Sequence, residues 1–309
     1  MIADGRGLAA RRTVAGRRTP RPGDSPYDAP TMTTRIRSLA LGDVPALTAA
    51  ILADDWGERR MWLEFVATHP ACRSAVAVDQ DGAPFGTAVA TVNGTVGWIG
   101  TVWVRSDRRG GGIGKALTAS VLDAAEDAGC RTLVLVATEA GRPLYEGLGF
   151  RVQTWYVTVE APGLPPGPDD PRIRAFTPAD LDAMARLDVA ATGEDRRHLL
   201  AAFANPLDSR VMDDGQGGLA GFVVRALWGG GATVAPDPSD ALALLDARRR
   251  ASGPERHVRA GVVLDNPSGV KRLQAAGWTE AWRAPRLIRG DSLDWHPEHL
   301  WGQFNHALG

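Results

Sequence analysis

Apolar residues recur along the chain at two spacings, one typical of strands and one typical of helices. Short and largely apolar runs predict strands at residues 74–78, 87–92, 98–104, 132–137 and 155–159. Asn93-Gly94 separates two of these runs and is a strong signal for a β-hairpin. Leu117, Val121 and Leu122 repeat at helical spacing. These elements predict an α/β (α+β) fold with helices flanking a mixed, mostly antiparallel sheet.

The same order of elements occurs twice. Residues 36–43 resemble residues 173–180, because each segment is an Ile-Arg strand that leads into an amphipathic helix. Residues 140–150 align with residues 268–278 in the same way. Pro and Gly dominate the segment between the copies, which indicates a linker. We therefore expect two domains of similar topology, each with its own mixed sheet, at residues 33–160 and 172–309, joined by a linker at 161–171.

Composition and charge exclude several classes of protein. The chain has 35 Lys and Arg against 36 Asp and Glu, a net charge of −1, which argues against dedicated nucleic-acid binding. The chain has no run of about 18 apolar residues, so we expect no membrane span. Two cysteines 58 positions apart suggest neither a disulfide framework nor a metal site and favour a cytoplasmic protein. The six histidines show no ligand spacing, so we expect no metal.

The first 32 residues differ from the rest of the chain. They are rich in Arg and Pro and lack an apolar run. Such a segment buries too little surface to offset its ordering entropy, so we expect a disordered N-terminal extension. A nucleic-acid-binding arm is the alternative.

A glycine cluster carries the strongest chemical signal. The run is Arg109-Gly110-Gly111-Gly112-Ile113-Gly114-Lys115, between the strand ending Val102-Trp103-Val104 and a helix. Backbone N–H groups at such a helix start can hold a pyrophosphate. A P-loop would need Gly at position 109 and Ser or Thr at position 116, and a dinucleotide fingerprint would need Gly at position 115. The pattern that fits is Arg-x-x-Gly-x-Gly.

With this loop and the later block Leu144-Tyr145-Glu146 and Leu148-Gly149-Phe150, the chain resembles the GCN5-related N-acetyltransferases (GNATs). The resemblance implies that acetyl-CoA is the co-substrate and that residues 102–104 and 109–115 bind it. Its tandem plan is similar to a two-domain bacterial subgroup. The second copy looks degenerate, since it lacks the glycine loop and Leu273 replaces the tyrosine. The family often has Asn where this chain has Thr138-Glu139-Ala140.

The reaction needs a proton acceptor for the amine and a proton donor for the departing thiolate. Tyr145 is the candidate acid, and Glu139, at the end of a central strand, is the candidate base. Both could instead be structural or solvated residues. Asp54, Asp55, Glu58 and Glu64 are further carboxylates in the segment where the family shapes its acceptor pocket.

The sequence thus predicts an acyl-CoA-dependent N-acyltransferase that acts on the primary amine of a small molecule, with the second copy forming part of the acceptor cleft. The alternatives are an acetyltransferase for proteins or peptides and a non-catalytic acyl-CoA-binding regulator. The sequence does not determine the oligomeric state, and a homodimer is one possibility.

Overall fold

The computed structural model describes residues 34–225 and 231–308. The expected extension at residues 1–32 lies outside the described residues. The first copy of the repeat contains β1 (Arg35–Arg37), α1 (Val44–Ala53), α2 (Arg60–Thr68), β2 (Cys72–Val78), β3 (Pro84–Asn93), β4 (Val96–Val104), α3 (Ile113–Asp127), β5 (Thr132–Val136), α4 (Arg142–Glu146) and β6 (Arg151–Pro162).

The second copy follows the same order. It contains β7 (Ile173–Ala175), α5 (Leu181–Thr192), α6 (Arg197–Phe203), β8 (Arg210–Asp213), β9 (Leu219–Arg225), β10 (Gly231–Val234), α7 (Pro238–Ser252), β11 (His257–Val263), α8 (Gly269–Ala275), β12 (Thr279–Gly290) and β13 (Leu300–Gly302). Short 3-10 turns lie at Leu41–Asp43, Ser106–Arg108, Pro178–Asp180 and Pro297–His299.

The predicted repeat is confirmed in its hydrogen bonds. Arg37 donates to Asp43 at 2.6 Å in the first copy, and Arg174 donates to Asp180 at 2.8 Å in the second. Each aspartate also accepts from a backbone N–H three residues earlier, which fixes the start of the helix that follows. The bond to Arg174 lowers the pKa of Asp180 to about 2.

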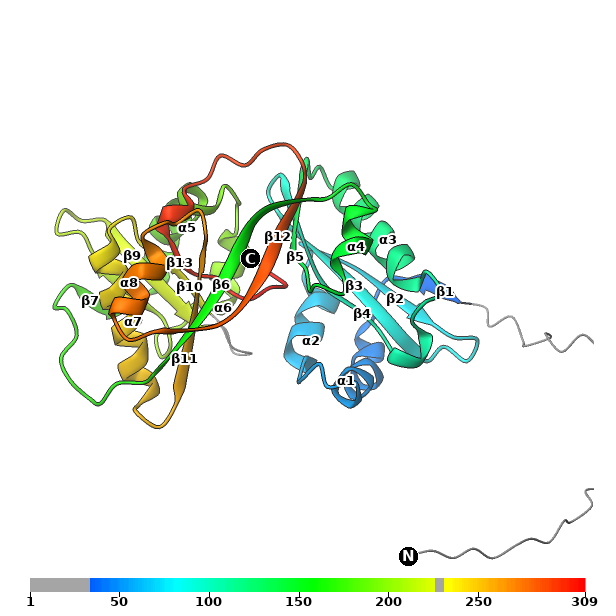
Figure 1. The fold of residues 1–309 in the computed structure, drawn as a ribbon, viewed down its shortest axis with the longest axis horizontal. Helices are drawn as coiled ribbons and strands as arrows, with labels where there is room; N and C mark the ends of the chain where they lie inside the picture. The colour runs from blue at the N-terminus through cyan, green and yellow to red at the C-terminus, as the bar shows by residue number, and fades with distance from the viewer. Residues whose placement is uncertain (1–33, 226–230, 309) are drawn as a thin grey trace, which may run out of the picture. The chain divides into compact units, whose positions relative to one another are not determined.

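The strands form two sheets. The larger has the order β1-β2-β3-β4-β5-β12-β6-β11 and is antiparallel except between β4 and β5. The smaller has the order β13-β10-β9-β8-β7 and is antiparallel between its described strands. Helices flank the sheets (Figure 1), so the predicted fold class is confirmed.

The expectation that each copy has its own sheet is wrong. β12 of the second copy lies between β5 and β6 of the first, and β6 pairs in turn with β11. The two long strands are therefore exchanged between the copies and run side by side in Figure 1. Strand alternation specifies which face of a strand is buried but not which strand lies beside it, so the exchange has no local signature.

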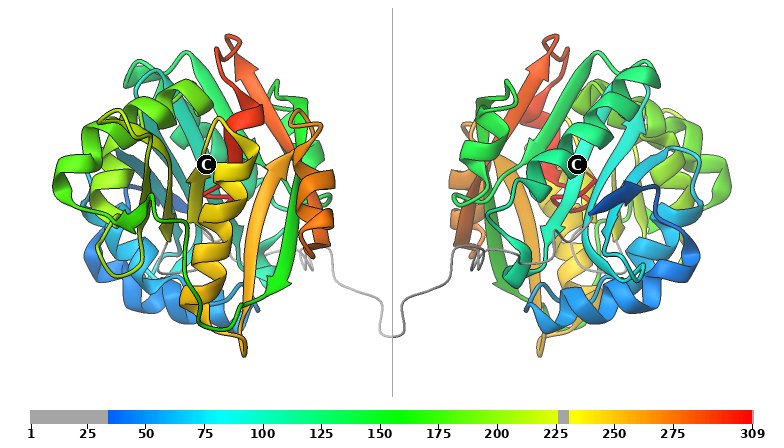
Figure 2. Two further views of the ribbon diagram at one scale, coloured as in Figure 1. Left: turned by 90° about the vertical axis from the view of Figure 1, so that its left-hand side faces the viewer. Right: turned by 90° about the vertical axis from the view of Figure 1, so that its right-hand side faces the viewer.

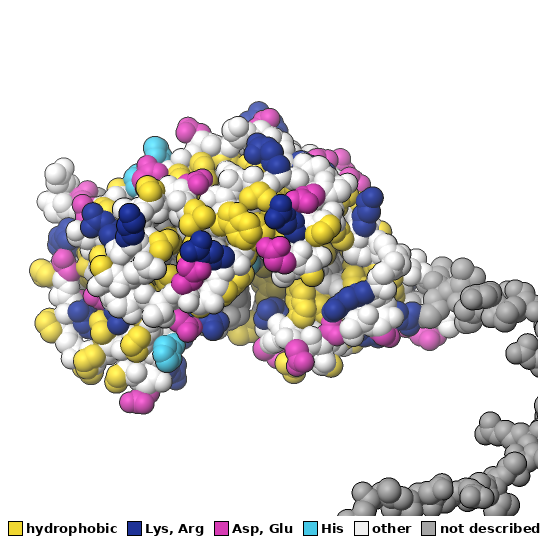
Figure 3. All heavy atoms as spheres, viewed as in Figure 1, with side chains coloured by type: hydrophobic (Ala, Val, Ile, Leu, Met, Phe, Trp, Pro, Cys, Tyr) yellow, Lys and Arg dark blue, Asp and Glu magenta, His cyan; other side chains and the backbone are white. Residues whose placement is uncertain are grey.

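Helices cover both faces of the first-copy strands. α3 packs on β2, β3 and β4, whereas α1 packs on β3 and α2 on β2 from the other side. In the second copy, α7 packs on β9, β10 and β11, and so touches both sheets; it runs along them in the left view of Figure 2. Acidic and basic side chains are interspersed over the face in Figure 3.

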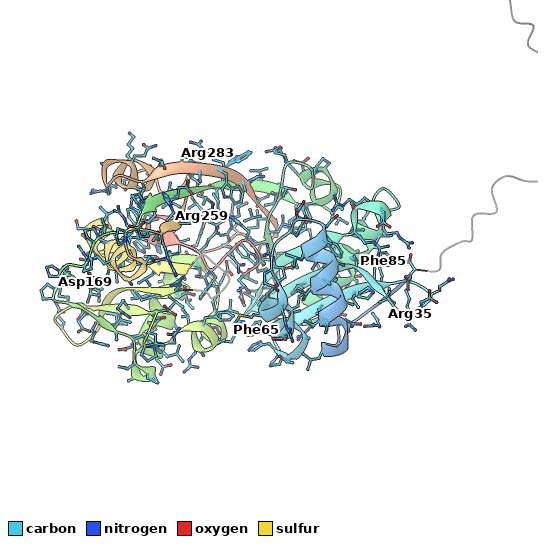
Figure 4. All side chains as sticks on the ribbon, turned by 90° about the horizontal axis from the view of Figure 1, so that it is seen from below. Arg35, Phe65, Phe85, Asp169, Arg259 and Arg283 are labelled. Carbon is cyan, nitrogen blue, oxygen red and sulfur yellow. The ribbon has the colours of Figure 1, made fainter. Side chains whose placement is uncertain are left out.

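One apolar core joins the copies. Leu47 and Trp62, from α1 and α2, belong to the same buried cluster as Met184, Phe222 and Phe304 of the second copy. The Phe65 ring lies 5.2 Å from the Phe203 ring, and Figure 4 shows Phe65 where the two copies meet. Each fully buried side chain of this size contributes about 1.5–3 kcal/mol, so neither copy can lose the other without exposing much of its core.

Candidate active site

A cavity of about 950 Å³ opens where β4 and β5 part, and both copies line it. The strand and glycine-loop side is formed by Ile99, Gly100, Thr101, Val102, Trp103, Val104, Arg108, Arg109, Gly110, Gly112, Ile113, Gly114 and Lys115. The remaining wall is formed by Trp56, Arg59, Trp62, Val136, Ala137, Thr138, Ala140, Gly141, Leu144, Tyr145, Trp282, Asn305, His306 and Ala307.

The parting of β4 and β5 is built into β4. Parallel pairing runs from Val96 to Ile99 and then stops, while β4 stays paired with β3 on its other side. Its register on β3 shifts at Thr101, whose φ of 51° is left-handed. The Thr101 hydroxyl accepts a 2.7 Å hydrogen bond from the Trp62 indole, which holds this irregular residue. A bulge of this kind re-aims backbone groups at an active site.

The glycine loop ends at the start of α3 and has the conformation that a phosphate site requires. Gly110 and Gly112 have φ of +87° and +78°, and Gly112 is the residue that caps the helix. A Cβ on either glycine, or on Gly111, would meet nothing within 4 Å. The first amides of a helix have no partner within it and lie at its positive end. The loop can therefore receive an anionic group from the cavity.

The cationic residues of this loop have different surroundings. The Arg109 guanidinium donates to the Val104 carbonyl at 2.8 Å. It also pairs with Asp54, and this ion pair connects the glycine loop to the end of α1. Hydrogen bonds from Ser106 and Trp103 and the charge of Arg109 lower the pKa of Asp54. Arg108 lies over the Phe85 ring at 5.3 Å. Lys115 lines the cavity in the first turn of α3.

Tyr145 lies on α4 in the cavity wall. Its ring packs edge-on against Phe150 at 6.2 Å, and the Phe150 N–H donates to the Tyr145 carbonyl at 3.1 Å. Burial raises the pKa of Tyr145 to about 12, so the hydroxyl keeps its proton at neutral pH. Within the described residues this hydroxyl makes no hydrogen bond, which leaves it available to a ligand.

The carboxylates proposed from sequence are not in the cavity wall. Glu139 is exposed and does not line the cavity, although Thr138 and Ala140 on either side of it do. The Thr138 hydroxyl accepts from the Gly141 N–H at 3.1 Å. Of the other four candidates, Asp54 is engaged by Arg109, Glu64 pairs with Arg60, and Asp55 and Glu58 are exposed. Among the described residues that line the cavity there is no Asp or Glu.

The structure adds residues that sequence reasoning missed. Asn305, His306 and Ala307 reach the cavity from the segment after β13, and Trp282 reaches it from β12. A Cβ on Gly100 would lie 2.5 Å from the Ala307 backbone, so this segment passes directly over β4. Glycine within a strand often marks such a close approach, so Gly100 was the sequence signal that could have indicated this contact. Burial lowers the pKa of His306 to about 4, so its imidazole is neutral at pH 7.

The equivalent position in the second copy is closed to a phosphate. The Asp237 carboxylate accepts from the Ser239 and Asp240 amides and so caps α7 itself, at 2.7 and 3.3 Å. A carboxylate there also repels an anion. Leu273 takes the place of Tyr145 and is fully buried, while Trp278 repeats the backbone bond of Phe150, donating to the Leu273 carbonyl at 3.0 Å.

Residues 34–225 and 231–308 contain no grouping of three His, Cys, Asp or Glu that could hold a metal ion. Across those same residues, no helix combines the length and apolar character needed to cross a bilayer.

Comparisons with known proteins agree with this geometry. Residues 45–150 match the acetyltransferase (GNAT) family, and residues 184–302 match an acetyltransferase (GNAT) domain. No curated protein matches the chain.

Solved structures are similar in fold over most of the chain. A putative acetyltransferase from Pyrococcus horikoshii is 18% identical, with a TM-score of 0.74 over 89% of this chain and 96% of that one. A GCN5-related N-acetyltransferase from Sphaerobacter thermophilus is 18% identical, with a TM-score of 0.59 over 85% and 98%. A tandem GNAT protein from the clavulanic acid biosynthesis pathway is 16% identical, with a TM-score of 0.58 over 84% and 100%.

Proposed function

The chain belongs to the GCN5-related N-acetyltransferase family as a tandem of two GNAT domains, and we propose that its first copy moves an acetyl group from acetyl-CoA to the primary amine of a small molecule. One observation carries the proposal. The glycine loop at the start of α3 is open to a cavity that also contains a protonated tyrosine, whereas the matching helix start in the second copy is capped by Asp237.

The residues of the first copy fit the co-substrate. Amides from Gly110 to Lys115, with the charge of Lys115, would hold its pyrophosphate at the helix N-terminus. The side of β4 beyond Ile99, which has no neighbouring strand among the described ones, would face its extended arm. In this arrangement residues 102–104 would present a backbone N–H to the thioester oxygen, where negative charge develops.

The chemistry follows from this placement. The neutral amine attacks the thioester carbonyl carbon, a C–N bond forms and the C–S bond breaks. The departing sulfur takes a proton from the Tyr145 hydroxyl. The amine nitrogen gives its surplus proton to water, and water returns a proton to the tyrosinate. Because apolar side chains form much of the cavity wall, desolvation lowers the pKa of a bound ammonium group and so favours the neutral amine. We therefore assign no base to Glu139.

A small acceptor suits the cavity better than a protein chain. The segment from Asn305 to Ala307, which passes over β4, and the Trp282 side chain line the cavity, so part of its wall belongs to the second copy. A basic peptide would also meet a wall without a carboxylate in its described residues.

The test is release of free thiol from acetyl-CoA with panels of small amines and peptides. We expect release with small amines and little with lysine peptides. Binding of coenzyme A without release from any amine would favour a non-catalytic regulator and contradict the proposal.

A further inference from the structure

The charge of the cavity wall is one-sided. Its ionised side chains are Arg59, Arg108, Arg109 and Lys115, and none of its described residues is an Asp or Glu. Arg109 and Lys115 belong to the glycine loop and Arg108 directly precedes it, so the coenzyme phosphates would lie beside these three cations. Arg59 lies outside that loop and needs another explanation.

Arg59 is held at the cavity by an unusual turn between α1 and α2. Asp55 and Gly57 have φ of 60° and 74°, and Arg59 directly precedes α2. One guanidinium nitrogen donates to the Glu58 carbonyl at 2.8 Å. Within the described part of the chain, no carboxylate lies at ion-pair distance from this guanidinium, and burial lowers its pKa. The charge of Glu58 opposes this lowering without forming an ion pair, so the half-buried guanidinium can still receive an anion.

The neighbouring Arg60 shows the contrast. Its side chain is exposed and pairs with Glu64 at 2.9 Å, one helical turn along α2. Two consecutive arginines therefore differ in one respect that matters for ligands: Arg60 has its own carboxylate, and Arg59 lines the cavity without one.

Three tryptophans line the same cavity as Arg59. Trp56 and Trp62 flank it in sequence, and Trp282 reaches the same cavity from the second copy. Trp62 is fixed by its bond to Thr101 at the bulge of β4, and Trp282 packs edge-on to His306 at 4.6 Å. Since the His306 imidazole is neutral at pH 7, Trp282 and His306 add uncharged surface to the part of the wall that the second copy supplies.

We propose that the acceptor is an amine that also carries a compact anionic group, a carboxylate in its simplest form, which Arg59 binds while an apolar body lies among Trp56, Trp62 and Trp282. This inference rests on the acetyltransferase activity proposed above. Polyamines and other polycationic acceptors are disfavoured, because their additional charges would face cations with no acid beside them.

The test uses pairs of amines that differ in one carboxylate: leucine and isopentylamine, phenylalanine and phenethylamine, tryptophan and tryptamine. Thiol release gives kcat/KM for each member with the full chain and with Arg59→Gln, Arg59→Lys and Arg60→Gln. We expect the carboxylate member of at least one pair to be preferred by roughly 10-fold or more, as a charge-assisted fork would give. Arg59→Gln should remove that preference, Arg59→Lys should keep part of it, and Arg60→Gln should keep it all.

The outcomes separate this inference from the proposed function. A higher kcat/KM for the plain amine in every pair, or an equal loss for both members in Arg59→Gln, would overturn the inference and leave the acetyltransferase standing. No thiol release from either member of any pair would overturn both. Coenzyme A affinity of each variant, measured in parallel, shows whether the variant is folded.

Discussion

Tyr145 is the residue on which the proposed chemistry depends most. Its hydroxyl lies in the cavity wall and is protonated at pH 7, since burial raises its pKa to about 12. The raised pKa keeps the hydroxyl protonated throughout the neutral range but also makes it a weaker acid, so its proton passes to sulfur only as negative charge builds up on the departing thiolate.

Tyr145→Phe should lower kcat by roughly 100-fold, the lower range for general acid catalysis, and leave coenzyme affinity nearly unchanged. The ring and its contact with Phe150 remain, so only an interaction made in the transition state is lost. Steady-state kinetics and a coenzyme titration measure the two quantities. Normal turnover in the variant would show that the tyrosine only packs.

At the residue scale, the sequence predicts the site residues whose role depends on their immediate neighbours in the chain. It does not predict those whose role depends on contacts with distant segments. Arg109, Gly112 and Gly114 could be recognised because their spacing alone builds a helix start. Arg59 and His306 could not, because their role depends on a left-handed turn and on a C-terminal segment folding back over β4. The place of Glu139 after a central strand predicts a site residue, but the direction of a side chain at a strand end is not set by its position in the sequence.

At the scale of elements, the two copies differ most at the starts of α3 and α7. Glycine begins α3 and leaves the first amides open, whereas aspartate begins α7 and satisfies two of them. Both helices were predictable from apolar spacing. The different function of their first turns was predictable too, because it depends on adjacent residues.

Asp237→Ala should reduce the free energy of unfolding by about 1 kcal/mol, the usual loss when a helix cap is removed. Urea denaturation at pH 7 measures it. The matched control is Asp127→Ala at the exposed C-terminal end of α3, where removing a negative charge should cost nothing. An equal loss in both variants would mean that the cap bonds of Asp237 contribute little.

At the scale of the whole molecule, the exchange of β6 and β12 makes the copies interdependent. Without the second copy, β5 would keep β4 but lose β12, and β6 would lose both of its partners, β12 and β11. Apolar surface on α1 and α2 would be exposed as well. None of this was predictable, because the alternating pattern of a strand is the same whichever neighbour it pairs with.

Residues 34–171 expressed alone should therefore fail to fold, and coexpression with residues 172–309 should restore a folded pair. Circular dichroism melting and size-exclusion chromatography distinguish the cases. A monomeric 34–171 fragment with a cooperative melt would show that the exchange is not needed for stability.

Stability should also fall in acid, because two histidines stack where the copies meet. His69 at the end of α2 lies 5.3 Å from His198 on α6, and burial lowers the pKa of His198 to about 4. The unfolded chain binds this proton near pH 6.5, so stability is lost as pH falls from about 6.5 towards 4. Between pH 7 and pH 4.5, the free energy of unfolding of His198→Phe should fall by about 1 kcal/mol less than that of the parent protein. This figure allows for the partial exposure of His198, and urea titrations at the two pH values measure it. An identical loss in both proteins would assign the acid sensitivity elsewhere.

Calorimetric titration of coenzyme A into the parent protein, Gly112→Val and Gly82→Val tests the coenzyme site most directly. Both glycines have left-handed φ and open surroundings, so valine strains each by about 1–3 kcal/mol. Gly82 lies in the turn between β2 and β3, away from the cavity, whereas Gly112 begins α3. We expect one site per chain in the parent and in Gly82→Val, and no measurable binding in Gly112→Val. Two sites per chain, or unchanged affinity in Gly112→Val, would contradict the assignment of the coenzyme to the first copy.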